Sequence, residues 1–555
     1  MKRKLKITRY IGIAALMGCV PLQQSCKDFL DITPNDQIVG ESLTAENLPS
    51  LTSPLYNVVW ADFNEKFYFG LGDGASYNLY APYSDYVYPF ADLAVTGITG
   101  PLVQAWQSFY VVVQQANKVI ISIKQSSATE AQKQQYIAEA RFMRGVAYWY
   151  LASLWGNVPI TEDPSAIVNQ PVVNTNPRKD VFEFAIRDLE YAAKYLPATS
   201  PQLGRLNKYS AYGMLSRVYL AYSGYIDNSG NANGGTRNQQ YLDLAKNAAR
   251  VVINQSNFHL MDYYPDLFKV ENNNNTESMF ALQWVPGLNN STGWGYINPH
   301  QAYFAYSSEI TGDDAAWGGW TRATYDVIKE YNPRDSIRRK ATWIGYGDFY
   351  AEINKANGGL LNDRGDGRQY LNVKKGVVGS SKDNPGVGRM NSALNTYMMR
   401  LAEVYLNYAE AILGNSGSTS DGDATEYFNR VRKRAGMPEK TSITYEDIRY
   451  ERRVEFCMEG QYWYDLVSRA FYKQQEVINY ITAQSRNTII PFLFEAPNVL
   501  QIDPDRASSP RAVGAVTPSI FVMPYPESEL LQNPLLKEAP VPYVFTEVRI
   551  TDLFD

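Results

Sequence analysis

Flat aromatic rings set among turn-forming residues are the side chains of this sequence best placed to do chemistry. Aromatic residues make up 13% of the 555 residues, and Tyr alone accounts for 42 of them. The rings gather in two segments, at Tyr77, Tyr80, Tyr83, Tyr86 and Tyr88, and at Trp284, Trp294, Tyr296, Tyr303, Tyr306, Trp317 and Trp320. A sugar has an apolar ring face and a belt of hydroxyls, which aromatic rings and neighbouring Asn, Asp, Gln and Arg side chains complement. Both segments therefore favour sugar recognition.

Gly, Asn, Pro, Ser and Asp surround these rings and keep the backbone in exposed turns. Loops on a rigid scaffold are where recognition residues concentrate. We therefore predict a ligand platform made of Trp294, Tyr296, Trp317 and Trp320, with help from Tyr77 and Tyr80. The alternative is that the rings pin long loops to the body of the protein, and for any single ring the sequence leaves both interpretations open.

The sequence contains no recognisable catalytic motif. His259 and His300 are isolated, with no nearby Ser in a nucleophile-elbow pattern and no H-E-x-x-H motif. The pair Asp313-Asp314 and Glu309 could supply two carboxylates for glycoside hydrolysis, but that chemistry needs both groups in one cleft. Adjacent Asp residues in a Gly-rich loop are more often turn formers. We predict no catalytic residue, and a secreted glycosidase is the alternative.

Metal and cofactor motifs are equally weak. Three Cys and two His leave little for a zinc site, and Asp421-Gly422-Asp423 lacks the rest of a calcium loop, so a turn is expected there. We predict no metal and no cofactor. The charges of Glu451-Arg452-Arg453-Val454-Glu455 predict an ion-pair network that fixes helix packing, because buried charges are costly unless paired. Cys457 is predicted to be a small apolar core residue.

The first residues form a secretory signal. Lys2, Arg3, Lys4, Lys6 and Arg9 precede an apolar stretch, Ile11 to Met17, that is too short to span a bilayer. Cys19 and Cys26 follow it, where bacterial lipoproteins carry their lipid acceptor. Judged locally, Leu16-Met17-Gly18-Cys19 is the better lipidation motif. The mature chain is expected to be anchored to a membrane rather than to span it.

Charge and length exclude other classes. Without the five basic residues of the signal, the chain has 47 basic against 57 acidic residues, so non-specific nucleic-acid binding is not expected. Hydrophobic residues make up 45%, as in globular proteins. A chain of this length predicts two packed domains or one large helical array.

Helical periodicity dominates the elements that must position the aromatic segments. Apolar residues recur every three or four positions in runs that predict helices over 103–123, 142–154, 177–196, 209–222, 241–253, 398–413, 427–435 and 445–470. Asn176-Pro177 predicts an N-cap with Pro at the first helical position. From about 258 to 395 the composition instead predicts irregular loops and short strands lying on the helices. The last eighty residues are rich in Pro, which forbids long helices there.

These elements predict a mainly α fold, in which tetratricopeptide-like helix pairs form a scaffold and a long irregular region packs on it. The expected organisation is a signal peptide at 1–25, a helical region at 26–257, and a C-terminal region at 258–555 containing the loop-rich insert.

Five segments in order resemble the SusD/RagB family. They are Glu139 to Pro159 ("YGdVPL" at its end), Arg400 to Ala411 ("RLAEvyLmyAEA"), Asn429 to Gly436 ("lNaVRaRAG"), Glu451 to Leu466 ("ERRvEfafEGhRwfDL") and Pro526 to Pro534 ("iPqsElnlNPnL"). Because family members commonly start with Cys before an acidic "DFLD"-like stretch, Cys26-Lys27-Asp28-Phe29-Leu30-Asp31 favours Cys26 as the lipidation site, against the local argument for Cys19.

The resemblance implies an outer-membrane lipoprotein of Bacteroidetes-type bacteria, facing the exterior. Such proteins sit on a TonB-dependent, SusC-like transporter and capture nutrients, usually oligosaccharides, without catalysis. An oligopeptide ligand stays open within the family, and a helical scaffold that binds only protein is a further alternative.

Overall fold

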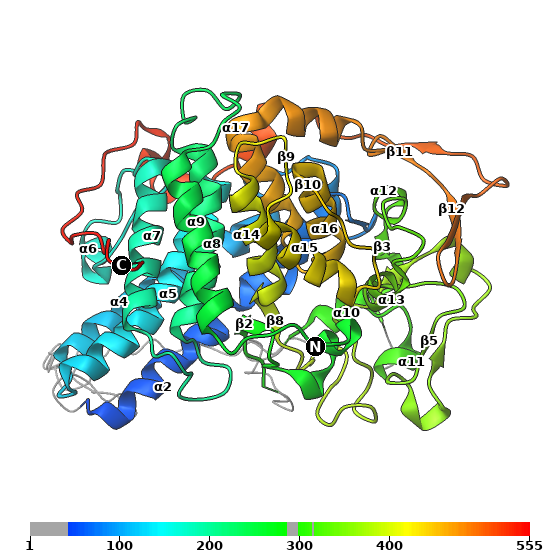
Figure 1. Ribbon diagram of the computed structural model, residues 1–555, viewed down its shortest axis with the longest axis horizontal. Helices are drawn as coiled ribbons and strands as arrows, with labels where there is room; N and C mark the ends of the chain where they lie inside the picture. Colours follow the sequence, from blue (N-terminus) through cyan, green and yellow to red (C-terminus); the bar gives the residue numbers. More distant parts are fainter. Residues whose placement is uncertain (1–42, 286–297, 313–315, 555) are drawn as a thin grey trace, which may run out of the picture.

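The computed structural model describes residues 43–285, 298–312 and 316–554, and its helices form a body on which a loop-rich region packs (Figure 1). Several residues singled out in the sequence lie outside the described residues: Cys19, Cys26, Trp294, Tyr296, Asp313 and Asp314. The predicted fold class is confirmed, because paired, tetratricopeptide-like helices dominate the described chain.

The helical body is built from long helices that each pack against the next. They are α4 (Gly100–Gln125), α5 (Glu130–Leu154), α7 (Arg178–Tyr195), α8 (Lys208–Tyr225), α9 (Gln239–Gln255), α14 (Leu401–Leu413), α15 (Gly422–Arg434), α16 (Tyr445–Glu455) and α17 (Tyr462–Thr482). Helix α5 packs on α4 and α7, α8 on α7, α9 and α17, and α14 on α9, α15 and α16. Short helices precede and connect them: α2 (Leu48–Thr52) and α3 (Tyr88–Ala91) come before α4, and α6 (Pro164–Asn169) lies between α5 and α7.

Side-chain caps start most of the long helices. Thr129, Asn207 and Thr444 each accept a hydrogen bond from a backbone N–H of the first turn and form a capping box. The predicted cap of α7 is wrong by one residue: Pro177 occupies the N-cap position, and Asn157 Oδ1 accepts the Arg178 N–H at 2.9 Å instead. Asp421 caps α15, so the predicted turn at Asp421-Gly422-Asp423 is a helix start.

Several predicted helices are wrong in extent. Helix α5 starts at Glu130, not at residue 142, and α15 starts at Gly422, not at residue 427. The run from Met398 begins as strand β8 (Thr396–Arg400), because pairing with β2 (Ser278–Leu282) claims its backbone before α14 begins. The run from Tyr445 to Ala470 is two helices, α16 and α17. Between them Met458 and Gly460 adopt left-handed backbone conformations, which end an α-helix. Cys457 lies in this break, fully buried, and burial raises the pKa of its thiol to about 12.

Strands β2 and β8 fix where the loop-rich region leaves and rejoins the helical body. The two strands are antiparallel neighbours, so the chain between residues 282 and 396 departs and returns at one place beside α8 and α14 (Figure 1). The described part of that region holds helices α10 (His300–Phe304), α11 (Ser308–Thr311), α12 (Tyr325–Ile328) and α13 (Ser336–Thr342), and strands β3 (Arg322–Ala323), β4 (Trp343–Ile344), β5 (Phe349–Tyr350), β6 (Leu360–Leu361) and β7 (Asn372–Val373).

A small antiparallel sheet joins this region to the N-terminal part of the chain. Its strand order is β1-β3-β7-β4, where β1 is Leu79–Tyr80. Tyr80 pairs with Arg322 and Leu79 with Ala323, and Arg322 pairs in turn with Asn372. The sheet therefore sets the first aromatic segment directly beside the segment that follows Trp320.

The C-terminal chain extends from α17 as an arm and then returns to the helical body. The arm contains β11 (Thr488–Ile489), paired with β14 (Ser509–Pro510), and β12 (Phe492–Glu495), paired with β13 (Val499–Ile502). Figure 1 shows it reaching from the end of α17 towards α12 and β5. Beyond it, α18 (Glu527–Gln532) is the longest α-helix, as the prolines predict.

Charged side chains fill the interface between the helical body and the loop-rich region. Arg338 on α13 pairs with Glu451 at 2.6 Å and with Glu455 at 3.2 Å, and all three side chains are fully buried. Arg400, Arg432 and Arg434 converge on the same helix and its glutamates. The ion-pair network predicted for Glu451 to Glu455 is thus present.

The main hydrophobic cluster contains residues from Leu48 to Leu536, on both sides of the predicted boundary at residue 258. The division there stays a prediction. Within the described residues, no helix combines the length and the apolar character needed to cross a bilayer.

Candidate ligand-binding site

Two hollows meet at the edge of the small sheet. We call the first the inner cavity; its volume is about 350 Å³, and it lies among residues 77–83, 320–326, 369–370, 485–492 and 503–506. The second, the outer hollow, is more open and has a volume of about 610 Å³. It is lined by residues 65–66 and 83–86 and by Tyr303, Trp317, Trp320 and Met390. The sheet register explains the meeting, because β1 and β3 carry both aromatic segments to one edge.

Two aromatic rings separate the hollows and line both of them. Tyr83 and Trp320 lie edge to face with their ring centroids 5.1 Å apart. They form a ridge that stays open to solvent, since Tyr83 is 75% and Trp320 48% exposed. An exposed aromatic pair over two hollows is a surface on which the apolar face of a sugar ring can rest.

Behind the ridge, Arg322 stacks on the rings of Trp320 and Tyr370. The Arg322 guanidinium carbon lies 4.4 Å from the Trp320 ring centroid and 3.2 Å from that of Tyr370. Its Nε donates to Gly319 O at 2.9 Å. Burial lowers the pKa of Arg322, and no ion pair joins it to a carboxylate within the described chain. Stacking fixes the plane of the guanidinium, and Arg322 lines the inner cavity, where a guanidinium can donate to hydroxyls.

The outer hollow continues the aromatic surface. Trp317 is 44% exposed, and its ring centroid lies 5.7 Å from that of Tyr303, which lies 4.9 Å from that of Tyr86. Tyr303 donates its hydroxyl to Glu65 at 2.6 Å, and burial together with this hydrogen bond raises the pKa of Tyr303. Lys66 and Asp85 add charged groups that suit hydroxyls at the rim.

The structure brings together four of the six predicted platform residues. Trp317 and Trp320 are exposed at the two hollows, and Tyr80 is half-buried in the inner cavity, with Arg511 stacked 4.0 Å from its ring centroid. Tyr77 also lines the inner cavity, but only 4% of it is exposed, and its hydroxyl donates to Ser485 O. Trp294 and Tyr296 lie outside the described residues, so their place in the platform stays a prediction.

Sequence reasoning missed the residues that come from distant segments. Arg322 stands two positions after Trp320 and could have been noticed. Tyr370, Arg506 and the arm residues Ile489 to Phe492 carry no local signal, because only the folded arm brings them to the inner cavity. Trp284, which the sequence grouped with the exposed rings, is 5% exposed and donates its indole N–H to Thr396 Oγ1.

The carboxylates of the inner cavity are already engaged. Asp326 pairs with Lys329 at 2.6 Å and accepts the Ser485 N–H at 3.0 Å. Asp503 accepts the Asp505 N–H at 3.0 Å and faces Arg506 at 3.9 Å. Glu309, a candidate for glycoside hydrolysis, lies apart from both hollows and accepts a hydrogen bond from Asn354. Both aspartates therefore act as structural acceptors that hold the arm and α12.

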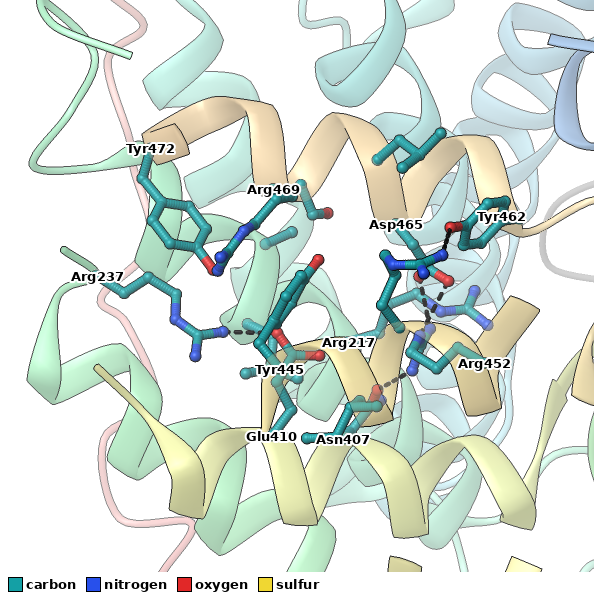
Figure 2. Close-up of a pocket in the computed structure, with 16 residues that line it drawn as sticks. Arg217, Arg237, Asn407, Glu410, Tyr445, Arg452, Tyr462, Asp465, Arg469 and Tyr472 are labelled. Atoms are coloured by element: carbon teal, nitrogen blue, oxygen red, sulfur yellow. Dashed lines mark hydrogen bonds and ion pairs between the residues drawn. The ribbon is translucent and has the colours of Figure 1, made fainter. Parts of the chain in front are cut away.

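A further polar cavity lies inside the helical body, where α8, α14, α16 and α17 meet (Figure 2). Its side chains bind one another: Arg237 pairs with Glu410 at 2.6 Å, and Arg452 with Asp465 at 2.6 Å. The cavity measures about 40 Å³, which holds water but no sugar ring. We interpret it as part of the packing of the helices. No cluster of His, Cys, Asp or Glu that could hold a metal ion occurs in the described chain.

Comparison with known proteins matches the whole chain. A model of the "SusD family" matches residues 266–541, and one described as "Starch-binding associating with outer membrane" matches residues 80–220. A SusD-like protein of Bacteroides ovatus is 39% identical and covers 99% of both chains. The starch-binding protein SusD of Bacteroides thetaiotaomicron is 25% identical over 61% of this chain and 65% of its own length.

A solved structure shares both fold and sequence. It is a crystal structure with xylogluco-oligosaccharide, 40% identical, with a TM-score of 0.83 over 90% of this chain and 100% of its own.

Proposed function

Because this chain belongs to the SusD family, we propose that it captures oligosaccharides at the cell surface and delivers them to a TonB-dependent, SusC-like transporter. The observation that carries the proposal is the exposed ridge of Tyr83 and Trp320 between two hollows. A protein 40% identical over nearly the whole chain was solved with xylogluco-oligosaccharide, which supports the choice of ligand class. The predicted platform residues Trp317, Trp320, Tyr77 and Tyr80 belong to this proposal, as do Trp294 and Tyr296.

We propose that the protein holds its ligand and does not cleave it. Glycoside hydrolysis needs one carboxyl group to donate a proton and a second to attack or to activate water, roughly 5 to 10 Å apart across the bond. Asp326 and Asp503 are both committed to backbone N–H groups and cations. Relatives that are named as binding proteins support the same conclusion.

An array of glycans and peptides, probed with the soluble chain from residue 27, tests the ligand class. Binding to oligosaccharides, followed by recovery of the intact ligand from the complex, is the expected result. Binding to peptides alone would favour the oligopeptide alternative, and shortened oligosaccharide products would favour a glycosidase. If the chain binds neither sugars nor peptides, the proposal of a capture protein is wrong.

We propose outer-membrane attachment through a lipid on Cys26, with the protein facing the exterior. Its place after the signal and before Asp28-Phe29-Leu30-Asp31 supports this choice. Mass spectrometry of the mature N-terminus is expected to find a diacylglyceryl group on Cys26. A lipid on Cys19, or an unmodified start, would contradict the assignment.

The transporter partner is proposed from family membership, since capture at the surface does not by itself move a ligand inward. Pull-down from detergent-solubilised outer membrane should recover a TonB-dependent barrel with this protein. Recovery of the lipoprotein alone under mild conditions would count against the partnership.

A further inference from the structure

The inner cavity differs from the outer hollow in what it can accept. The outer hollow is the more open of the two, so a chain of sugars can lie over Trp317 and Trp320. The inner cavity is more enclosed, and the arm residues 485–492 and 503–506 form one of its walls. A more enclosed cavity favours a group that ends inside it over a chain that passes through.

Its size points to a short group. At about 350 Å³ the inner cavity lies near the lower limit of ligand pockets, which range from about 300 to 1,000 Å³. Tyr83 and Trp320 line both hollows, so a sugar stacked on this ridge has one edge towards each of them. A substituent on that sugar can therefore point towards the inner cavity.

The walls of the inner cavity suit a hydroxyl-rich, uncharged group. Its four charged residues are Arg322, Arg506, Asp326 and Asp503, so their formal charges cancel. Asp326 and Asp503 accept hydrogen bonds from backbone N–H groups, whereas Arg322 is held flat with no carboxylate partner in the described chain. Tyr325 and Phe492, with ring centroids 6.1 Å apart, add an apolar wall for the CH face of a sugar.

We propose that the inner cavity is a branch subsite, which makes the protein selective for oligosaccharides whose main chain carries short, neutral side sugars. This inference rests on the proposed function. The main chain lies on Trp317, Trp320 and Tyr83 in the outer hollow. The side sugar passes behind the ridge into the inner cavity, where Arg322 donates hydrogen bonds to its hydroxyls.

The test compares ligands that differ only in their branches. Isothermal titration of the soluble chain uses a linear β-1,4-linked glucan oligosaccharide and a xylogluco-oligosaccharide with the same main chain and neutral branches. The branched ligand should bind at least about tenfold more tightly. A xylan oligosaccharide with a glucuronic acid branch should gain nothing over its unbranched form, and a gain would overturn the preference for neutral branches.

Two substitutions that fill the inner cavity from two different segments of the chain test whether the cavity binds the branch. Thr488→Trp on the arm and Gln369→Trp on a separate segment that lines the same cavity should each lower the affinity for the branched ligand to that of the linear one. Val499→Trp is the matched control, because Val499 lies on the same arm, is 54% exposed and does not line the cavity. Thermal melts show whether each variant is folded. Because the two substitutions are independent, the test still works if one variant does not fold.

The outcomes separate the branch subsite from the proposed function. Equal binding of linear and branched ligands, unchanged by either Trp substitution, would overturn the branch subsite and leave oligosaccharide capture intact. Substitutions that weaken the linear ligand as much as the branched one would show that the cavity takes the chain end, which also overturns the inference. If no oligosaccharide binds at all, the proposed function fails together with it.

Discussion

At the scale of single residues, the exposed fraction of each ring decides what its truncation will reveal. Trp320 and Trp317 are nearly half exposed and contribute little to the core, whereas Tyr77 is almost fully buried against Arg486 and Arg511. The same substitution to Ala therefore measures binding at the first two positions and folding at the third.

We expect Trp320→Ala and Trp317→Ala each to weaken oligosaccharide binding by about 2 kcal/mol, roughly thirtyfold, without a change in melting temperature. Tyr77→Ala should instead lower the free energy of unfolding by about 3 kcal/mol or more. Titration calorimetry and thermal melts of the three variants check this. Early melting of both Trp variants, or binding like the parent, would mean that these rings anchor loops.

His300 predicts a pH dependence of stability. Burial lowers the pKa of its imidazole from 6.5 to about 4, and the hydrogen bond from Nε2 to Asn64 O at 2.6 Å opposes this only in part. The unfolded chain therefore takes up a proton below pH 6.5 that the folded protein rejects until about pH 4. The stability due to neutral His300 is present above pH 6.5 and is lost as the pH falls towards 4.

We expect the parent protein to lose about 2 to 3 kcal/mol more stability than His300→Gln between pH 7 and 4.5. Urea unfolding at the two pH values measures the loss of stability for each protein. Subtracting the loss of the variant from that of the parent removes the contributions of the groups that both proteins share. His259→Gln is the matched control, because that side chain is exposed. Identical pH profiles of the parent and His300→Gln would show that His300 does not resist protonation.

At the scale of elements, the break between α16 and α17 links helix packing to the site. Asp73 accepts the backbone N–H groups of Met458 and Gly460 at 2.8 and 2.9 Å, and it also accepts a hydrogen bond from Asn78 at 3.0 Å. Asn78 lies between Tyr77 and β1. The corner after α16 therefore holds the turn that presents the first aromatic segment.

Gly460→Ala should be costly for two reasons at this corner. Gly460 has φ +67, which disfavours any side chain, and an added Cβ would lie 2.7 Å from Tyr68 O. We expect a loss of about 2 kcal/mol or more in the free energy of unfolding, measured by urea denaturation. Gly417→Ala, an exposed glycine with open space around its Cβ, should change stability by less than about 0.5 kcal/mol. Equal losses of stability for Gly460→Ala and Gly417→Ala would show that the backbone at Gly460 is not constrained in this way.

At the scale of the whole molecule, buried ion pairs hold the loop-rich region on the helical body. Arg338 lies on α13, directly before β4 of the small sheet, and its partners Glu451 and Glu455 lie on α16. The sheet that carries the ridge is thereby tied to the helices through one fully buried guanidinium. Loss of the Arg338 ion pairs should therefore destabilise the ligand-binding site as well as the core.

We expect Arg338→Met to cost about 3 to 5 kcal/mol of stability, because it leaves the buried Asp335 without its ion-pair partner and removes one of the cations that face Glu451 and Glu455. Arg430→Met, which removes the exposed pair with Glu426 on α15, should cost less than about 1 kcal/mol. Chemical denaturation of both variants provides the comparison. A similar small loss for Arg338→Met would show that the network rearranges and does not fix the two regions.

Local patterns predicted most of the helical body. The apolar spacing of α4 depends on residues within a turn or two of each other, so the sequence alone suffices to predict this helix. Two of the misplaced boundaries have tertiary causes. Strand β8 exists because β2, more than a hundred residues earlier, pairs with it, and α16 ends where Asp73 binds the turn that follows.

By itself the sequence determined the family, the mainly helical class, the ion-pair cluster around α16 and the two aromatic segments. Each of these can be recognised from residues that are close together in the sequence. Only the tertiary structure decided which rings reach solvent: Trp317 and Trp320 do, while Trp284 and Tyr77 are buried. It also decided that Arg322, Tyr370 and the arm share one cavity with β1. The reason is physical, because burial and the meeting of distant segments follow from long-range packing and strand pairing, which no local spacing encodes.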